Sequence, residues 1–145
     1  MEEMMKVLKG EDMCVLATVA GGVPHCSLMA YITDEKCRKV YMVTHRNTKK
    51  YANLLANPAV CLLIDTRRSG TRSLRENVQA LTVSGTFELV QDEGLVAGLK
   101  SRFVEAHPHL REFAQDPDAQ IFAIKLRELQ LLRDATDASY ETLET

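Results

Sequence analysis

The sequence predicts a mainly β protein, folded as a small closed barrel of about six antiparallel strands with a few helices. Three observations predict this fold class. β-rich runs, several of which alternate apolar and polar residues, recur along the chain. These runs do not alternate regularly with helices, which disfavours a parallel doubly wound sheet. One long run is interrupted by Gly85, and a mid-strand glycine often marks a bulge or a barrel bend.

Length and composition limit the class of protein. The chain has 145 residues, which favours one domain over residues 1–145. Its net charge of −2 argues against a general nucleic-acid binder. No apolar run reaches the roughly 18 residues that would span a bilayer, and the polar opening does not suit a signal peptide. The four cysteines form no C-x-x-C pair, so we expect free thiols, no metal site and a reducing cytoplasm.

The first half of the chain predicts a helix followed by an antiparallel meander. Residues 2–9 form a short amphipathic pattern, and residues 14–20 are β-rich. The turn sequence GGVP leads into residues 25–32, which alternate in character. This alternation places Cys26 and Leu28 on one face of a strand, and Ser27 and Met29 on the other. Residues 39–44 are the third predicted strand.

An amphipathic helix is expected next, followed by a buried strand. Tyr51, Leu54 and Leu55 have the i, i+3, i+4 spacing of a helical stripe. Asn57 precedes Pro58 and therefore ends this helix. The continuous apolar run of residues 59–65 predicts a strand that is buried on both faces.

The second half contributes two further strands and one longer helix. Residues 66–77 are a polar loop with four arginines. This loop could bind an anionic substrate, contact a second subunit or simply be solvated. A long strand is expected over residues 78–90, and a helix from Asp92 to about Ala106. Residues 107–118 are irregular or a short helix. The last strand covers residues 119–134, and its alternation slips near Glu128 as at a bulge. The tail after Asp134 is expected to be weakly ordered.

Two adjacent lysines, Lys49 and Lys50, stand where the helix after residue 44 begins. Thr48 is the expected N-cap, and the N–H groups of the first turn have no partner inside the helix. The helix dipole favours anions at this end. Two cations here therefore indicate that the helix start binds an anion that the chain itself does not supply. Phosphate suits such a site well, whereas solvated lysines are the simpler alternative.

The same stretch resembles the FMN-binding split-barrel family, whose best-known member is pyridoxamine 5′-phosphate oxidase. The resemblance rests on Thr44 at a strand end, the sequence Thr48-Lys49-Lys50, and Asn57-Pro58 before the next strand. It implies a Greek-key split barrel that forms a homodimer with FMN at the subunit interface. It also implies a flavin-dependent oxidoreductase that takes a nicotinamide nucleotide or a small-molecule substrate.

Carried over to this chain, the resemblance implies a set of cofactor-binding residues. Lys49 and Lys50 would hold the FMN phosphate, while Thr44 and Thr48 would add hydrogen bonds beside Val43. The second strand would contact the isoalloxazine ring, partly through its backbone, at Cys26, Ser27, Leu28, Met29 and Tyr31. Either Gln79 or Ala80 would face the flavin from a later strand.

Departures from the family pattern leave the reaction open. Cys26 and Tyr31 replace an arginine and a lysine of the oxidase, and the chain lacks tryptophan and ends in an acidic tail. Pyridoxamine phosphate oxidation is therefore not expected. Three alternatives remain from the sequence: an FMN carrier without catalysis, a haem protein with His25 or His45 as axial ligand, and a protein that binds the deazaflavin F420.

Overall fold

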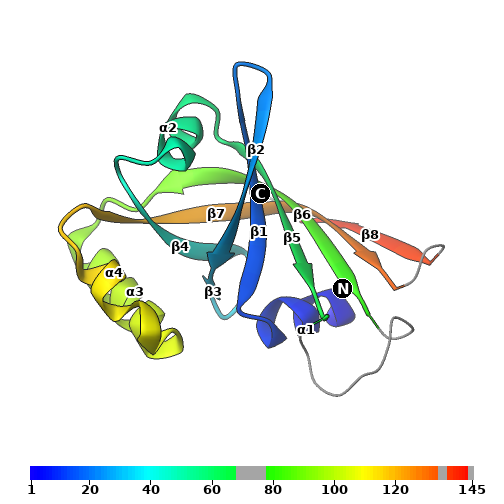
Figure 1. Cartoon of the computed structure of the whole chain (residues 1–145). Helices are drawn as coiled ribbons and strands as arrows, with labels where there is room; N and C mark the ends of the chain where they lie inside the picture. Colours follow the sequence, from blue (N-terminus) through cyan, green and yellow to red (C-terminus); the bar gives the residue numbers. More distant parts are fainter. Residues whose placement is uncertain (68–77, 134–136, 144–145) are drawn as a thin grey trace.

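The computed structural model describes residues 1–67, 78–133 and 137–143, and its strands form one strongly curled antiparallel sheet (Figure 1). The strands are β1 (Met13–Ala20), β2 (Val23–Ala30), β3 (Ile32–Thr33), β4 (Lys39–His45), β5 (Ala59–Asp65), β6 (Ala80–Leu89), β7 (Ala119–Leu132) and β8 (Ala138–Thr142). The helices are α1 (Glu2–Gly10), α2 (Lys49–Ala56), α3 (Glu93–Ala106) and α4 (Arg111–Gln115), with the 3-10 turn η2 (Pro108–Leu110).

The sheet is a split barrel, as the sequence predicts in outline. Its strand order is β2-β1-β5-β6-β7-β4-β3, and β8 pairs with β7 beside this path. The expected closure is not complete, because no ladder joins β2 to β4 in the described part of the chain. β1 and β2 form a hairpin that projects beyond the sheet (Figure 1). Its turn uses Gly21 and Gly22, both with positive φ (59° and 77°), a conformation that glycine adopts without steric cost.

Two groups of buried side chains hold the sheet together. The larger group fills the concave, inner face of the sheet and includes Leu16, Met29, Met42, Leu62 and Leu131. The smaller group lies on the opposite, outer face, where α3 and α4 cover β4 and the start of β7. The strands β1, β2 and β5 have no such cover on their outer face within the described residues.

The predicted irregularity in the last strand is confirmed as a bulge between β6 and β7. Ser84 lies opposite Glu128, whereas Gly85 lies opposite Leu126, so Arg127 is the extra residue. A Cβ at position 85 would come within 2.6 Å of Ile124 Cγ2 and 2.7 Å of the Lys125 carbonyl oxygen. The two backbones can approach this closely only with glycine.

Two expectations about individual strands are wrong. β5 is not buried on both faces, because Leu62 and Ile64 are fully buried while Leu63 between them is 38% exposed. Nothing among the described residues covers the outer face of β5, so its apolar run reflects one core face and one open face. The expected strand over residues 25–32 is also divided, since β2 ends at Ala30 and β3 pairs with β4 instead of β1.

Part of the segment after Asp134 forms a strand that the sequence does not predict. Residues 138–142 form β8, which pairs with residues 128–132 of β7. β4 pairs with β7 only as far as Lys125, so the rest of this edge is open to another strand. Arg133 also ties this region to α1 through a 2.6 Å contact with Glu3. Residues 134–136 and most of the arginine loop, at 68–77, lie outside the described residues.

Candidate anion and cofactor site

The hydroxyl of Thr48 organises the start of α2. Its Oγ1 donates to the carbonyl oxygen of His45 at 2.8 Å and accepts the N–H of Tyr51 at 3.2 Å. Since its only proton goes to His45, the 3.3 Å contact with Thr44 requires the Thr44 hydroxyl to donate. The predicted N-cap is therefore confirmed, and the cap is joined to the end of β4.

Two backbone N–H groups remain for a ligand at this helix end. The first turn of a helix leaves its N–H groups without intrahelical partners. Thr48 takes the one from Tyr51, which leaves the N–H groups of Lys49 and Lys50 without an acceptor among the described residues. No acidic residue lies in this first turn. Backbone dipoles and lysine charges therefore add up at one place, which favours an anion there.

The Lys50 ammonium is the least compensated charge of the site. The side chain is half-buried, and burial lowers the pKa of Lys50 below its ordinary value. Its Nζ lies 3.2 Å from the Met29 sulfur, and a thioether is only a weak acceptor. None of the carboxylates in the described residues forms an ion pair with it. A bound anion would supply the missing partner.

The inner face of β2 forms the wall opposite α2. Ser27 lies beside Leu16 of β1, and Met29 beside Cys14, so both follow the buried face of β1. α2 is held against the inner face of the neighbouring strand β1 by a buried hydrogen bond from Asn53 Nδ2 to Thr18 Oγ1, at 3.2 Å. This pair was not predicted from the sequence. Its signal is a polar residue, Asn53, directly beside the apolar Leu54, and both are buried in α2.

The structure brings together only part of the predicted site. Thr44, Thr48, Lys50 and Met29 are joined by the contacts described, and the exposed Lys49 adjoins them. Three other predicted side chains lie on the outer face of the sheet. Val43 packs with Ile121 and Phe103 under α3, and Cys26 and Leu28 are exposed outside β2. Any contact from these three to a ligand on the inner face would use their backbone.

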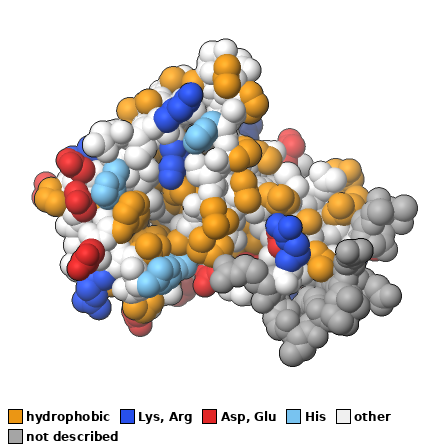
Figure 2. All heavy atoms as spheres, in the orientation of Figure 1, with side chains coloured by type: hydrophobic (Ala, Val, Ile, Leu, Met, Phe, Trp, Pro, Cys, Tyr) orange, Lys and Arg blue, Asp and Glu red, His pale blue; other side chains and the backbone are white. Residues whose placement is uncertain are grey.

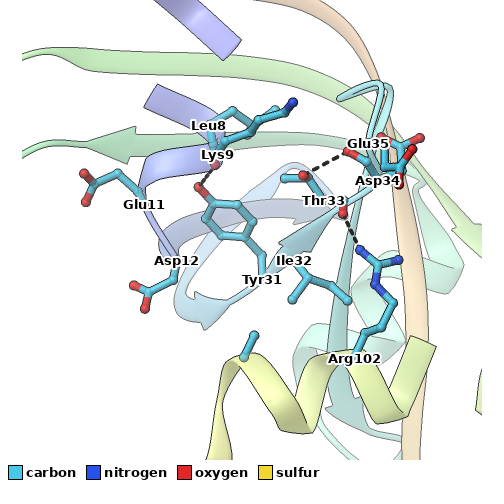
Figure 3. A pocket seen from close by; sticks show the side chains of 11 residues that line it. Leu8, Lys9, Glu11, Asp12, Tyr31, Ile32, Thr33, Asp34, Glu35 and Arg102 are labelled. Atoms are coloured by element: carbon cyan, nitrogen blue, oxygen red, sulfur yellow. Dashed lines mark hydrogen bonds between the residues drawn. The ribbon is translucent and has the colours of Figure 1, made fainter. Parts of the chain in front are cut away.

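Tyr31 lies away from α2, in a hollow of about 420 Å³ between α1, β3 and α3 (Figure 3). Its side chain is 2% exposed, and its hydroxyl donates to the carbonyl oxygen of Leu8 at 2.6 Å. Burial first, and then the nearby groups Cys14, Glu11 and Asp12, raise the pKa of this phenol. Tyr31 therefore fastens α1 to the sheet, and its hydroxyl is already in use.

Three of the four histidines, His25, His45 and His107, occupy different environments. His25 lies beside Thr18 on the inner face of β2 and is half-buried. His45 lies on the outer face and stacks on Phe113 of α4, with ring centroids 4.5 Å apart. Its Nε2 is buried and has no hydrogen-bond partner among the described residues. His107 is buried, with Nε2 3.0 Å from the Tyr31 carbonyl oxygen.

Figure 2 shows basic side chains and a histidine over α2 and the adjoining part of β2. Acidic side chains lie farther to the left on the same face, where other histidine and basic side chains also appear. Hydrophobic side chains cover the middle of the same face. The exposed apolar residues of the uncovered strands include Val23, Leu28 and Leu63. A basic site thus borders an open apolar surface.

The sequence matches the family model described as pyridoxamine 5′-phosphate oxidase over residues 1–133. The chain belongs to this family. Membership in the pyridoxamine 5′-phosphate oxidase family agrees with the split barrel and with the resemblance in the sequence. A search of curated proteins gives no match. None of the helices in residues 1–67, 78–133 and 137–143 has the length and apolar character to cross a membrane.

Solved structures with the same fold are described as binding different cofactors. A FAD-binding protein from Mesorhizobium loti is 18% identical, with a TM-score of 0.73 and coverage of 90% of this chain and 91% of that one. HutZ, a haem storage protein from Vibrio cholerae, is 18% identical, with a TM-score of 0.73 and coverage of 91% and 92%. A haem-binding protein from Mycobacterium smegmatis is 15% identical, with a TM-score of 0.84, and this chain covers 57% of its length. At these low sequence identities, the structural similarity establishes the fold and not the cofactor.

Proposed function

We propose that this protein binds FMN, with the phosphate at the start of α2, and acts as a flavin-dependent oxidoreductase. The observation that carries the proposal is the Lys50 ammonium, half-buried at a helix N-terminus and without a carboxylate partner in the described residues. The N–H groups of Lys49 and Lys50, and the Lys49 ammonium, complete the set of donors. Phosphate offers several charged acceptor oxygens, so it fits this donor set.

The residues of the chain would bind and orient the cofactor. The Lys49 and Lys50 N–H groups and ammonium groups would hold the phosphate end. The inner face of β2, at Ser27 and Met29, would bound the ring system and limit its contact with water. The bound flavin would supply the hydride or electron chemistry, with a nicotinamide nucleotide as the proposed reductant. We assign no general acid or base.

The substrate is proposed to differ from pyridoxamine phosphate. By resemblance, the second strand of the oxidase carries an arginine and a lysine at the positions that Cys26 and Tyr31 occupy in this chain. The polar partners of the flavin therefore differ. Family membership therefore supports the cofactor class more than it supports that particular reaction.

We also propose a homodimer that covers the open apolar face of β1, β2 and β5. Leu28 on this face is 71% exposed in the single chain, and Leu63, which lies in the same row across Val15 of β1, is 38% exposed and adds to the same surface. Extended apolar patches bordered by polar residues mark interaction sites. Two of the four thiols are buried, and free thiols suit our proposal of a cytoplasmic location.

Haem binding is the second candidate, because the buried Nε2 of His45 has no partner in the described residues and haem iron takes histidine ligands. That ring lies on the outer face, under α4, and not on the inner face beside Lys50. His25 is the histidine on the inner face of β2. A Soret band that disappears in His25→Ala or His45→Ala would favour haem over flavin.

The proposal is tested by titrating FMN into the double variant Lys49→Ala/Lys50→Ala. The wild type should bind FMN, and the double variant should lose binding while its circular dichroism stays unchanged. The control is Lys6→Ala/Lys9→Ala on α1, which removes the same two charges from exposed positions remote from α2. Equal FMN affinity in both double variants would refute the proposed site.

A further inference from the structure

A hollow of about 480 Å³ lies on the outer face of the sheet, where β1, β5 and β6 run side by side. Small side chains line it, including Ala17, Ala59, Cys61 and Ser84. Ala17 lies opposite Cys61, and Cys61 lies opposite Ser84, so these three form one row across the three strands. The neighbouring row carries the larger Leu63 instead. The step from large to small side chains leaves the sheet surface recessed here.

The lining of this hollow is mainly apolar. Val19 and Pro24, from the β1–β2 hairpin, border it on one side, and Thr86 of β6 borders it on the other. Ligand pockets commonly have volumes between about 300 and 1,000 Å³, with apolar walls and a few polar groups that fix the orientation of the ligand. The size and lining of the hollow therefore suit a small apolar body.

Arg127 is the one charged residue among the described residues that line the hollow. It is the extra residue of the β-bulge, between the pairs Ser84–Glu128 and Gly85–Leu126. A bulge re-aims a side chain relative to the regular alternation of its strand. The bulge therefore brings a guanidinium group to the edge of an apolar hollow.

The charge of Arg127 is not compensated by an ion pair within the described residues. Its neighbour in sequence, Glu128, lines a different and smaller hollow with Tyr140 and Thr142. The planar guanidinium matches a carboxylate through two parallel hydrogen bonds. A phosphate monoester carries about 1.5 to 2 negative charges at pH 7, which a single arginine does not balance. Charge complementarity therefore favours a carboxylate.

We propose that this hollow binds an aliphatic carboxylate of medium chain length, with its alkyl chain over Ala59 and Cys61 and its carboxylate on Arg127. The site is independent of the proposed FMN site, because α2 contributes none of the lining residues. It also differs from the row of Leu28 and Leu63 on which we base the proposed dimer contact.

Decanoate provides the test, and decyltrimethylammonium, with the same chain and the opposite charge, is the matched ligand. Both are titrated calorimetrically, below the concentrations at which they form micelles, into the wild type and Arg127→Met. The variant should bind decanoate about tenfold or more weakly, the usual effect of one charged hydrogen bond. Its affinity for decyltrimethylammonium should not fall. Arg111→Met, which removes an exposed charge from α4, should bind decanoate as the wild type does.

A second variant tests the place of the alkyl chain. Ala59→Leu puts a larger side chain into the hollow at an exposed position, so the melting temperature should stay close to that of the wild type. Binding of decanoate should be lost. Ala97→Leu adds the same side chain at an exposed position of α3 and should leave binding unchanged.

Four results would overturn the inference. Equal decanoate affinity in Arg127→Met and the wild type would remove the assigned head-group contact. Undiminished binding to Ala59→Leu would place the ligand elsewhere. Decanoate that binds Leu28→Glu, in which the proposed dimer should dissociate, but not the wild type would show that a second copy of the chain occupies the hollow. Absence of decanoate binding to both proteins would exclude the site directly.

Discussion

Replacing Thr48 with alanine tests how the start of α2 is built. The change removes one hydroxyl that accepts the Tyr51 N–H at 3.2 Å and donates to the His45 carbonyl oxygen at 2.8 Å. Loss of a threonine N-cap costs about 1 kcal/mol of stability. In a chain of this length, 1 kcal/mol lowers the melting temperature by about 2–4 °C.

The same change should reduce FMN affinity only modestly. The proton of the Thr48 hydroxyl is already donated to His45, so it is not free for a phosphate oxygen. The loss of affinity then comes from ordering the uncapped first turn on binding. An added cost of about 1 kcal/mol corresponds to roughly fivefold weaker binding. Thr48→Ser keeps the hydroxyl and should restore both properties.

Differential scanning fluorimetry and a fluorescence titration with FMN measure the two effects on the same samples. A melting temperature of Thr48→Ala equal to that of the wild type would show that the hydroxyl does not cap α2. A loss of FMN affinity beyond about a hundredfold exceeds the ~1 kcal/mol of a cap. That result would identify Thr48 as a direct phosphate ligand and refute the structural assignment.

Three further predictions concern the fold, the pH response and the open surface. Overpacking in Gly85→Ala should lower the free energy of unfolding, measured in urea, by about 1–3 kcal/mol. Gly98→Ala should not lower it, because a Cβ at position 98 would meet nothing within 4 Å. Equal free energies of unfolding for the two variants would contradict the bulge geometry. Burial raises the pKa of Cys14 from 9.0 to about 12. The thiol of the unfolded chain therefore ionises first as pH rises from 9 to 12, which lowers the free energy of unfolding of the wild type. That free energy should fall less steeply with pH in Cys14→Ala than in the wild type. Parallel curves for the two proteins would refute this prediction. Leu28→Glu should dissociate the proposed dimer in sedimentation velocity, whereas Leu95→Glu on α3 should not; a persisting dimer would exclude this face.

The sequence predicted best where one local rule determines the structure. Thr48 was expected to cap α2, and its hydroxyl does so. Alternation correctly placed Met29 and Leu28 on opposite faces of β2, which the structure shows to be the inner and the outer face. The slip in pattern near Glu128 marked a real bulge, because alternation must shift where one strand has an extra residue. The family resemblance from Thr44 to Pro58 agrees with the match over residues 1–133.

Other features depend on the arrangement of distant segments. An apolar run such as residues 59–65 does not say how many faces are covered, and β5 has one open face. Tyr31, between β2 and β3, belongs to the same buried cluster as Met29, but the position of α1 directs its hydroxyl to Leu8. β8 forms because β4 stops short along β7, which no pattern within residues 138–142 reveals.

Binding of an FMN phosphate at the start of α2 is tested most directly by the absorption spectrum of the purified protein, followed by the mass of the ligand released by heat. We expect flavin bands and the mass of FMN. A Soret band would indicate haem, and a different flavin mass would indicate another cofactor such as F420. A colourless protein that also fails to bind added FMN would contradict the proposed binding outright.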